Sequence, residues 1–176
     1  MNTLKREHQT RFGIALGSNL GDRLNHFRTG LKALLHQVDD IKLLDLAPVY
    51  ETDPIDCPPG SQAFLNTVVE VQTCLDAHAL HRVLQGIEVL LGRPERRERN
   101  SPRPLDLDIL YAGDQIIDDD VLTIPHPRLH LRRFVLQPLA DIRPELIVPG
   151  QGKTVAELVA MLQEDEGAVR LVAREW

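Results

Sequence analysis

The chain is organised around the stretch Arg96-Arg97-Glu98-Arg99-Asn100-Ser101-Pro102-Arg103-Pro104-Leu105-Asp106-Leu107-Asp108-Ile109-Leu110-Tyr111. Its second half, residues 105–111, alternates apolar and acidic side chains and predicts a strand. Because successive side chains of a strand point to opposite faces, we expect Asp106 and Asp108 to share one face, roughly 7 Å apart along the backbone. Two such carboxylates repel each other unless a cation lies between them, and Mg²⁺ prefers carboxylate, phosphate and water oxygens. The pair is therefore a candidate metal and phosphate site.

The first half of this stretch supplies positive charge. Prolines at 94, 102 and 104 prevent a continuous helix, so we expect a loop that presents guanidinium groups. Arginine binds phosphate in a bidentate geometry. An Asp-x-Asp pair alone is usually a solvated strand face, and an arginine run alone is usually a solvated loop. Their adjacency favours a metal-nucleotide site. The arginines are Arg93, Arg96, Arg97, Arg99 and Arg103.

Length and charge bound the class of protein. The chain has 176 residues and a formal net charge of −6, which indicates one domain and argues against a nucleic-acid-binding surface. Cys57 and Cys74 have no metal-ligand spacing, and no apolar run is long enough to span a bilayer. We therefore expect a reduced, cytoplasmic protein whose single domain covers residues 11–176. Residues 1–10 are polar and are expected to be a disordered leader.

The first half of the chain predicts strands and one helix. Residues 12–16 form an apolar run, and Gly17 to Asp22 is a turn that leads into a helical apolar stripe with Asp22 as its N-cap. This turn is neither a Walker loop nor a dinucleotide fingerprint, so both a tight turn and a ligand-lining role stay open. Residues 41–50 predict a strand or a strand pair broken by Pro48, and residues 63–73 predict another strand.

Phe64 and Asn66 share one face of the strand over residues 63–73. An aromatic ring beside a carboxamide can hold a flat heterocycle by stacking and paired hydrogen bonds. The alternative is a core phenylalanine beside a structural asparagine.

The second half predicts three helices and a closing strand. The helices cover residues 76–91, with Gly92 as the left-handed C-terminal residue, residues 134–141, and residues 154–162 with a capping box at Thr154 and Glu157. A hairpin-type turn is expected at residues 112–114, and a strand at residues 170–176. His126 lies between two prolines and close to Arg128 and Arg132, so both a structural role and a phosphate contact stay open.

Several of these segments occur together in one known family. The chain resembles the 6-hydroxymethyl-7,8-dihydropterin pyrophosphokinases (2-amino-4-hydroxy-6-hydroxymethyldihydropteridine diphosphokinases) of folate biosynthesis. The similarity runs in order from about residue 12 to 149, and the Pro-Arg-x-Leu-Asp-Leu-Asp-Ile block is its most specific part. The motifs are Gly17-Ser18-Asn19-Leu20-Gly21, Tyr50-Glu51-Thr52, Phe64-Leu65-Asn66, Gly92-Arg93, Pro102 to Ile109, Ile124-Pro125-His126 and residues 134–139.

The resemblance implies a fold, a reaction and a set of site residues. The fold is an α+β ferredoxin-like sandwich with an antiparallel sheet flanked by helices. Asp106 and Asp108 are implied to hold two Mg²⁺ ions, with Arg93 and Arg103 as further catalytic residues. The nucleotide contacts are implied at Gln85, Glu88, Arg99, Ile109, Thr123, His126 and Arg132. The pterin contacts are implied at Thr52, Pro54, Phe64, Asn66 and Phe134, with the ring held between the two aromatic side chains.

The implied reaction is in-line attack of the pterin hydroxymethyl oxygen on the β-phosphorus of ATP, with release of AMP. Alignment of two substrates and neutralisation of charge suffice for it, and no general base is assigned. The substrates are small molecules, and the protein is expected to be a monomer without nucleic-acid or membrane partners. Two alternatives remain, a two-metal phosphohydrolase and a non-enzymatic nucleotide-binding regulator.

Overall fold

The computed structural model describes residues 9–54, 60–92, 102–162 and 169–176. In chain order its elements are β1 (Thr10–Ser18), α1 (Arg23–Gln37), β2 (Lys42–Leu46), β3 (Val49–Thr52), β4 (Phe64–Thr73), α2 (Ala77–Leu90), β5 (Asp106–Ala112), β6 (Ile117–Asp118), β7 (Thr123–Ile124), a 3-10 turn at Leu129–Leu131, α3 (Arg133–Ile142), α4 (Val155–Met161) and β8 (Arg170–Ala173).

The main sheet is antiparallel throughout. Its strands follow the order β5-β1-β4-β3-β8, and β2 pairs with the far end of β4. The first strand therefore lies between the third and last strands of a β-α-β-β-α-β unit, with β2 and β3 together as the second strand, which is the ferredoxin-like arrangement. The predicted α+β class with an antiparallel sheet and flanking helices is confirmed, and so is the break at Pro48 between β2 and β3.

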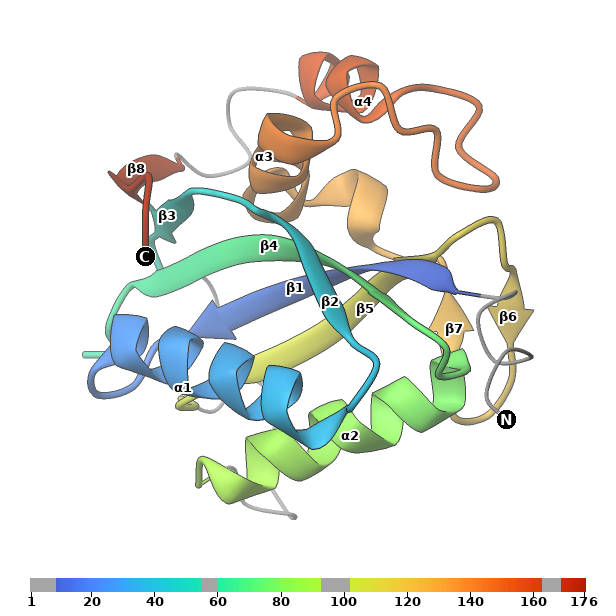
Figure 1. Cartoon of the computed structure of the whole chain (residues 1–176). Coiled ribbons are helices and arrows are strands. Elements are labelled where there is room, and N and C mark those ends of the chain that lie inside the picture. Colours follow the sequence, from blue (N-terminus) through green and yellow to red (C-terminus); the bar gives the residue numbers. More distant parts are fainter. Residues whose placement is uncertain (1–8, 55–59, 93–101, 163–168) are drawn as a thin grey trace.

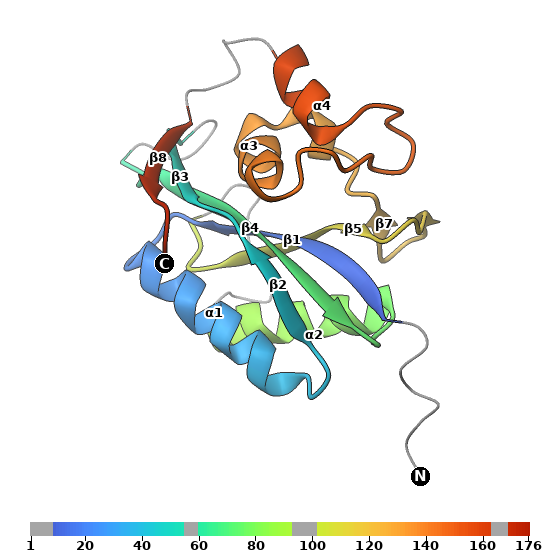
Figure 2. The same cartoon turned by 45° about the horizontal axis from the view of Figure 1, so that its top comes forward.

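Helices cover both faces of the sheet. Helices α1 and α2 lie on one face, and α3 and α4 lie on the other (Figures 1 and 2). The alternation along β5 shows why two cores form: Leu107 and Ile109 pack into the core under α1 and α2, whereas Leu110 packs into the core under α3 and α4. Asp106 and Asp108 lie on the same face as Leu110, as the strand pattern predicted.

Side-chain caps start three of the helices. Asp22 accepts a hydrogen bond from the amide of Asn25 at 3.1 Å, and Asp76 accepts one from the amide of Ala79 at 2.7 Å. Thr154 and Glu157 form a capping box at the start of α4. The caps predicted at Asp22 and Thr154 are confirmed, as is the left-handed Gly92, whose φ is 94°.

Buried polar contacts hold α3 against the sheet. Glu70 of β4 is fully buried and accepts a hydrogen bond from the Tyr111 hydroxyl at 2.8 Å. The guanidinium of Arg143, the residue that caps the C-terminus of α3, forms an ion pair with the same carboxylate. The hydroxyl of Tyr50 in β3 donates to Asp141 of α3 at 2.6 Å. These contacts fix the helix at its C-terminal end, so that its N-terminal end overhangs the sheet.

Two glycines make room for large side chains. A Cβ at Gly13 would lie 2.2 Å from the Tyr111 ring, and a Cβ at Gly30 of α1 would lie 2.4 Å from Leu105. Neither glycine has a positive φ, so close packing is what requires them.

The turn after β5 forms as predicted, but the strand that follows it does not pair with β5. Gly113 has a φ of 52° and the amide of Gln115 donates to Ala112, so the turn forms where it was predicted. The next strand does not return along β5, because β6 pairs with β7 in a separate two-stranded sheet. On the outer edge of β5, the Glu88 carboxylate of α2 instead accepts the amide of Leu107.

Strands β1 and β8 are the first and last elements in the described part of the chain. Strand β1 begins at Thr10, inside the segment predicted as a leader, and residues 1–8 lie outside the described part. Strand β8 pairs with β3, and the Trp176 ring packs against Phe27 with its centroid 5.6 Å away. Among the described residues, none of the helices has the length and apolar character needed to cross a membrane.

Candidate active site

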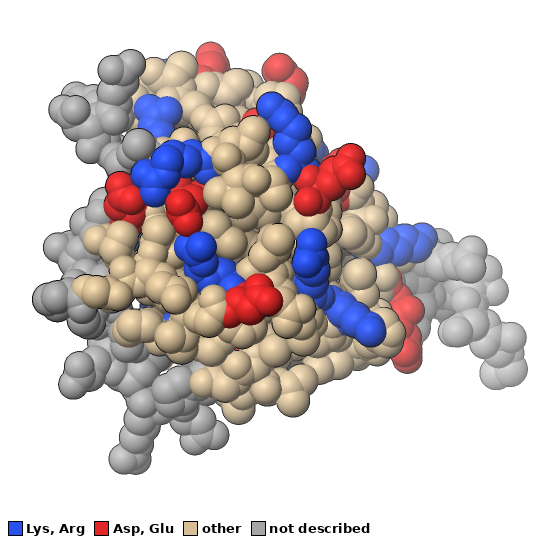
Figure 3. Space-filling view, turned by 90° about the vertical axis from the view of Figure 1, so that its left-hand side faces the viewer, with Lys and Arg blue, Asp and Glu red and all other residues tan. Residues whose placement is uncertain are grey.

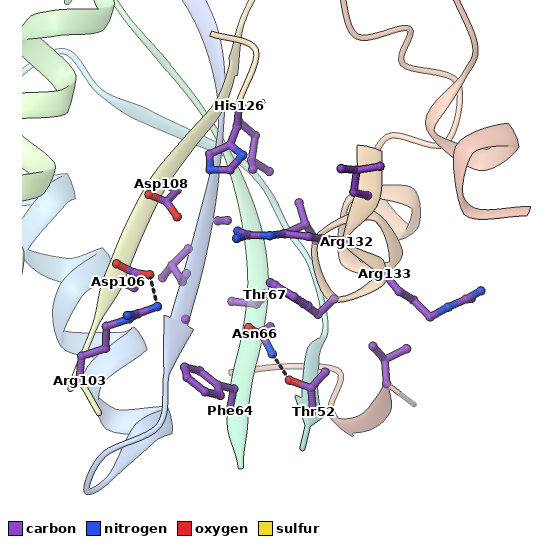
Figure 4. A pocket seen from close by; sticks show the side chains of 18 of the residues that line it. Thr52, Phe64, Asn66, Thr67, Arg103, Asp106, Asp108, His126, Arg132 and Arg133 are labelled. Carbon is purple, nitrogen blue, oxygen red and sulfur yellow. Dashed lines mark hydrogen bonds and ion pairs between the residues drawn. The ribbon is translucent and has the colours of Figure 1, made fainter. Parts of the chain in front are cut away.

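A pocket of about 420 Å³ lies on the sheet face that α3 overhangs (Figure 4). Its floor comes from β1, β4 and β5, and its walls come from the end of β3, the segment after β7 and the N-terminal turn of α3. The volume falls within the range of ordinary small-molecule sites. The pocket joins two chemically different ends, one charged and one aromatic.

The acidic part of the charged end is the pair Asp106 and Asp108. Their partners across the ladder are Gly17 and Ala15 of β1, so small residues flank both carboxylates on the floor. Burial raises the pKa of the Asp108 carboxyl, and the neighbouring Asp106 carboxylate raises it further. A cation between the two carboxylates would relieve both effects, so the pair fits a divalent ion.

Glu88 fixes the backbone between the two aspartates. Its side chain is buried, and one carboxylate oxygen accepts the amide of Leu107 at 2.7 Å. Within the described residues, no group of three or more His, Cys, Asp or Glu side chains gathers to bind a metal. The described part of the chain therefore offers two carboxylates here, and water or phosphate oxygens are the natural source of further ligands for Mg²⁺.

Cationic groups face the carboxylates. The Arg103 guanidinium forms an ion pair with Asp106 at 2.8 Å, and its central carbon lies 5.8 Å from the centroid of the Phe64 ring. Arg132 reaches over the pocket from the start of α3 (Figure 4). Burial lowers the pKa of Arg132, and the neighbouring Arg128 adds to that effect. An anion in the pocket would offset this crowding of positive charge.

His126 lies beside Asp108 at the same end. Its backbone amide donates to Leu110 of β5 at 2.9 Å, and its ring Nδ1 accepts the amide of Arg128 at 3.2 Å. Burial lowers the pKa of the imidazole, although Asp108 acts in the opposite direction. In the neutral ring, acceptance at Nδ1 leaves the proton on Nε2, which can then donate to a phosphate oxygen.

The aromatic end is built around Asn66. This side chain is 6% exposed, and its amide donates to the Thr52 hydroxyl at 3.0 Å. Phe64, from the same face of β4, and Phe134, from α3, also line the pocket. A buried carboxamide in a pocket that two aromatic side chains also line suits a flat, polar heterocycle.

Some predicted site residues are not among the described residues that line this pocket. Arg93 and Arg99 fall outside the described residues. Ile109 packs in the core, because it points to the opposite face from Asp108. Gln85 is exposed on α2, Thr123 lies in β7, and Pro54 follows the pocket residue Asp53 without lining the pocket. Nucleotide contacts at Gln85, Glu88, Ile109 and Thr123, and a pterin contact at Pro54, therefore stay predictions.

The pocket also contains residues that were not predicted. Asp53 lines it, and Arg170 of β8 forms an ion pair with Asp53 at 2.8 Å that lowers the pKa of its carboxyl. Val169, just before β8, lines the pocket as well. The face that carries β3 and β8 shows acidic and basic side chains next to one another (Figure 3). The pattern of the sequence holds no signal for these contacts, since they depend on which strand β8 joins.

Known proteins with similar sequences belong to the family that the motifs resemble. A family model described as 7,8-dihydro-6-hydroxymethylpterin-pyrophosphokinase (HPPK) matches residues 13–144. The 2-amino-4-hydroxy-6-hydroxymethyldihydropteridine pyrophosphokinase of Bacillus subtilis is 45% identical over 129 residues, which cover 73% of this chain and 75% of that protein. The protein of the same name from Pseudomonas aeruginosa is 39% identical over 147 residues, which cover 84% and 88%.

Longer proteins contain a similar segment. The folate synthesis bifunctional protein of Arabidopsis thaliana is 43% identical over 129 residues, which are 73% of this chain and 26% of that protein. The crystal structure of Plasmodium falciparum HPPK-DHPS with pteroate has a TM-score of 0.68 at 15% identity, covering 87% of this chain and 44% of the other. The chain thus spans less than half of these two longer proteins, and the Plasmodium structure supports the fold alone. The family model and the two bacterial relatives show that the chain belongs to the 7,8-dihydro-6-hydroxymethylpterin-pyrophosphokinase family.

Proposed function

We propose that the pocket binds both substrates of this family side by side, ATP phosphates at the charged end and pterin at the aromatic end. The reaction is transfer of pyrophosphate from ATP to the hydroxymethyl group of 6-hydroxymethyl-7,8-dihydropterin in folate biosynthesis. The observation that carries the assignment of residues is that the Asp106 and Asp108 pair and the buried Asn66 line one pocket.

At the charged end, Asp106 and Asp108 would hold two Mg²⁺ ions. When bound, these ions would neutralise phosphate charge and align the β-phosphorus with its attacking oxygen. The raised pKa of Asp108 supports this role, because a buried carboxylate without a counter-ion favours its protonated form. Arg103, Arg132 and His126 supply donors for phosphate oxygens.

At the aromatic end, Asn66 and Thr52 would bind the polar edge of the pterin, and Phe64 and Phe134 would cover its two faces. The hydroxymethyl oxygen then forms a bond to the β-phosphorus while the bond from that phosphorus to the AMP oxygen breaks. The hydroxyl proton leaves with solvent or a substrate oxygen. The protein forms no covalent intermediate, so its contribution is alignment and charge neutralisation.

Product analysis tests this function. The protein is incubated with ATP and Mg²⁺, with and without 6-hydroxymethyl-7,8-dihydropterin, and the nucleotides are separated. AMP that forms only when pterin and metal are both present is the expected result. ADP or free phosphate without pterin would identify a phosphohydrolase, and bound but unchanged ATP would identify a nucleotide-binding regulator.

A further inference from the structure

Asn19 is one of the most deeply buried polar residues outside the pocket. It follows β1 directly, in the glycine-rich turn that leads to α1, and it is 1% exposed. A tight turn on a protein surface needs no buried carboxamide, so the contacts of this side chain call for an explanation.

Two groups of Asn19, its backbone amide and its side-chain Oδ1, contact the backbone of Arg103. The backbone amide of Asn19 donates to the Arg103 carbonyl at 3.2 Å, and the side-chain Oδ1 accepts a hydrogen bond from the Arg103 backbone amide at 2.9 Å. The regular β1 and β5 ladder ends at the pair Gly17 and Asp106. Asn19 therefore continues the pairing past the end of the strand and replaces one backbone acceptor with a side-chain oxygen.

The neighbours of Arg103 explain why the Asn19 side chain is needed to accept the Arg103 amide. Pro102 and Pro104 flank it and have no amide hydrogen, so neither can donate to a ladder. The Arg103 amide is the only backbone donor of these three residues, and the Oδ1 of Asn19 accepts it. The backbone of Arg103 is thus held on both sides of the residue by Asn19.

Because Asn19 fixes the backbone of Arg103, it also limits where the Arg103 side chain can reach. The Arg103 guanidinium reaches Asp106 at 2.8 Å and lies over Phe64, so it borders both ends of the pocket. A long arginine side chain loses less freedom on binding when its backbone is already fixed. We propose that Asn19 is a positioning residue that sets Arg103 for contact with the transferred pyrophosphate. The inference rests on the proposed function, in which Arg103 binds phosphate.

A double-mutant cycle tests whether Asn19 acts through Arg103. Asn19→Ala is expected to lower kcat on the order of tenfold to a hundredfold, and Arg103→Ala to lower it at least as far. The double variant should be no slower than Arg103→Ala, because no guanidinium remains to be placed. Asn25→Ala makes the same chemical change at an exposed position of α1 and should leave kcat unchanged. Losses that multiply in the double variant, or a wild-type rate for Asn19→Ala, would overturn the inference.

A conservative variant guards against a failure to fold. Asn19→Asp keeps an acceptor oxygen for the Arg103 amide, and burial at this 1% exposed position favours the neutral acid, which has the shape of the carboxamide. Its kcat should stay within about threefold of the wild-type value, because the acceptor oxygen carries the contact. A loss from Asn19→Asp as large as that of Arg103→Ala, in a protein with wild-type circular dichroism, would contradict the role assigned to Oδ1.

Amide exchange separates this inference from the proposed function. Between residues 102 and 104 only Arg103 has an exchangeable amide, so its exchange reports on the Asn19 contact without any turnover. Exchange there should become at least about tenfold faster in Asn19→Ala than in Asn25→Ala. If wild-type protein makes no AMP, the proposed function fails whatever the exchange data show. If AMP forms but exchange at Arg103 is unchanged, only the role of Asn19 fails.

Discussion

Asp108 lies in a position that is unfavourable for an ionised carboxylate. Burial and the neighbouring Asp106 both raise its pKa. Asp108→Asn should therefore lower turnover on the order of 10³-fold while the metal-free protein unfolds at the same or a higher denaturant concentration. Steady-state rates and urea unfolding measure the two effects. Asp114→Asn, at the exposed turn beyond β5, is the matched control, and a folded Asp108→Asn variant with a near-wild-type rate would refute the metal role.

The two tyrosines of the chain offer a test of how α3 is held. Burial and Asp141 raise the pKa of Tyr50 to about 12, and burial and Glu70 raise that of Tyr111 as well. A pKa raised on folding means that the folded state keeps the phenolic proton more firmly than the unfolded state. The stabilisation is complete below the unfolded pKa of about 10 and is lost as the pH rises through the folded value.

Spectroscopic titration of phenolate absorbance checks this expectation. The folded protein should show no tyrosine ionising near pH 10, where both would ionise after unfolding. Tyr111→Phe leaves Tyr50 alone, and its titration should be centred near pH 12. A phenolate that forms at pH 10 in the folded Tyr111→Phe variant would contradict the contact between Tyr50 and Asp141.

At the scale of residues, prediction from the sequence depended on spacing. Asp106 and Asp108 could be placed together, because residues i and i+2 of a strand share a face. Phe64 and Asn66 followed by the same rule. The pairing of Asn19 with Arg103 joins residues 84 positions apart, and no local pattern specifies it. Arg170 and Asp53 likewise meet only because β8 joins β3.

One glycine in α1 and one in α2 allow the effect of helix propensity to be measured separately from the effect of packing. Gly86 of α2 has open space around its Cα, whereas a Cβ at Gly30 of α1 would strike the fully buried Leu105. Gly86→Ala should stabilise the protein by about 0.5 to 1 kcal/mol, since alanine is the better helix residue. Gly30→Ala should destabilise it by about 1 to 3 kcal/mol, because overpacking exceeds that gain. Urea unfolding gives both values, and changes of the same sign would contradict the packing argument.

At the scale of elements, periodicity predicted most of the structure. The apolar stripes and caps of α1, α2 and α4 were sufficient to predict them within a residue or two at most ends. Strands β6 and β7 have two residues each, too few for a periodic pattern, and their pairing was not predicted. The contact at the outer edge of β5 was not predicted either. There the Glu88 side chain of α2 accepts the amide of Leu107.

The whole molecule should respond to nucleotide only together with metal. The net charge of −6 repels a nucleoside triphosphate, and in the proposed arrangement Mg²⁺ would reduce that repulsion and link the phosphates to Asp106 and Asp108. A nonhydrolysable ATP analogue with Mg²⁺ at a hundred times its Kd should raise the free energy of unfolding by about 2.7 kcal/mol. The analogue with a chelator should give a much smaller rise. Equal stabilisation with and without metal would contradict the arrangement.

The oligomeric state is a further prediction at this scale. Among the described residues, the exposed large apolar side chains are spread over separate segments, including Leu90, Ile116 and Met161, and single exposed apolar residues are normal for a monomer. Sedimentation equilibrium should return the monomer mass of 19.8 kDa at micromolar concentrations. A mass twice as large would show that one of these surfaces pairs with a second copy.

The contact between Gly13 and Tyr111 also constrains how this protein can change over generations. A side chain at position 13 becomes acceptable only after the ring at position 111 has gone, because the ring fills its space. Loss of the ring in turn removes the phenol that donates to Glu70. The two substitutions are thus tolerated in one order only. In a mutational library built on this sequence, surviving clones with a larger residue at 13 should already carry a small residue at 111.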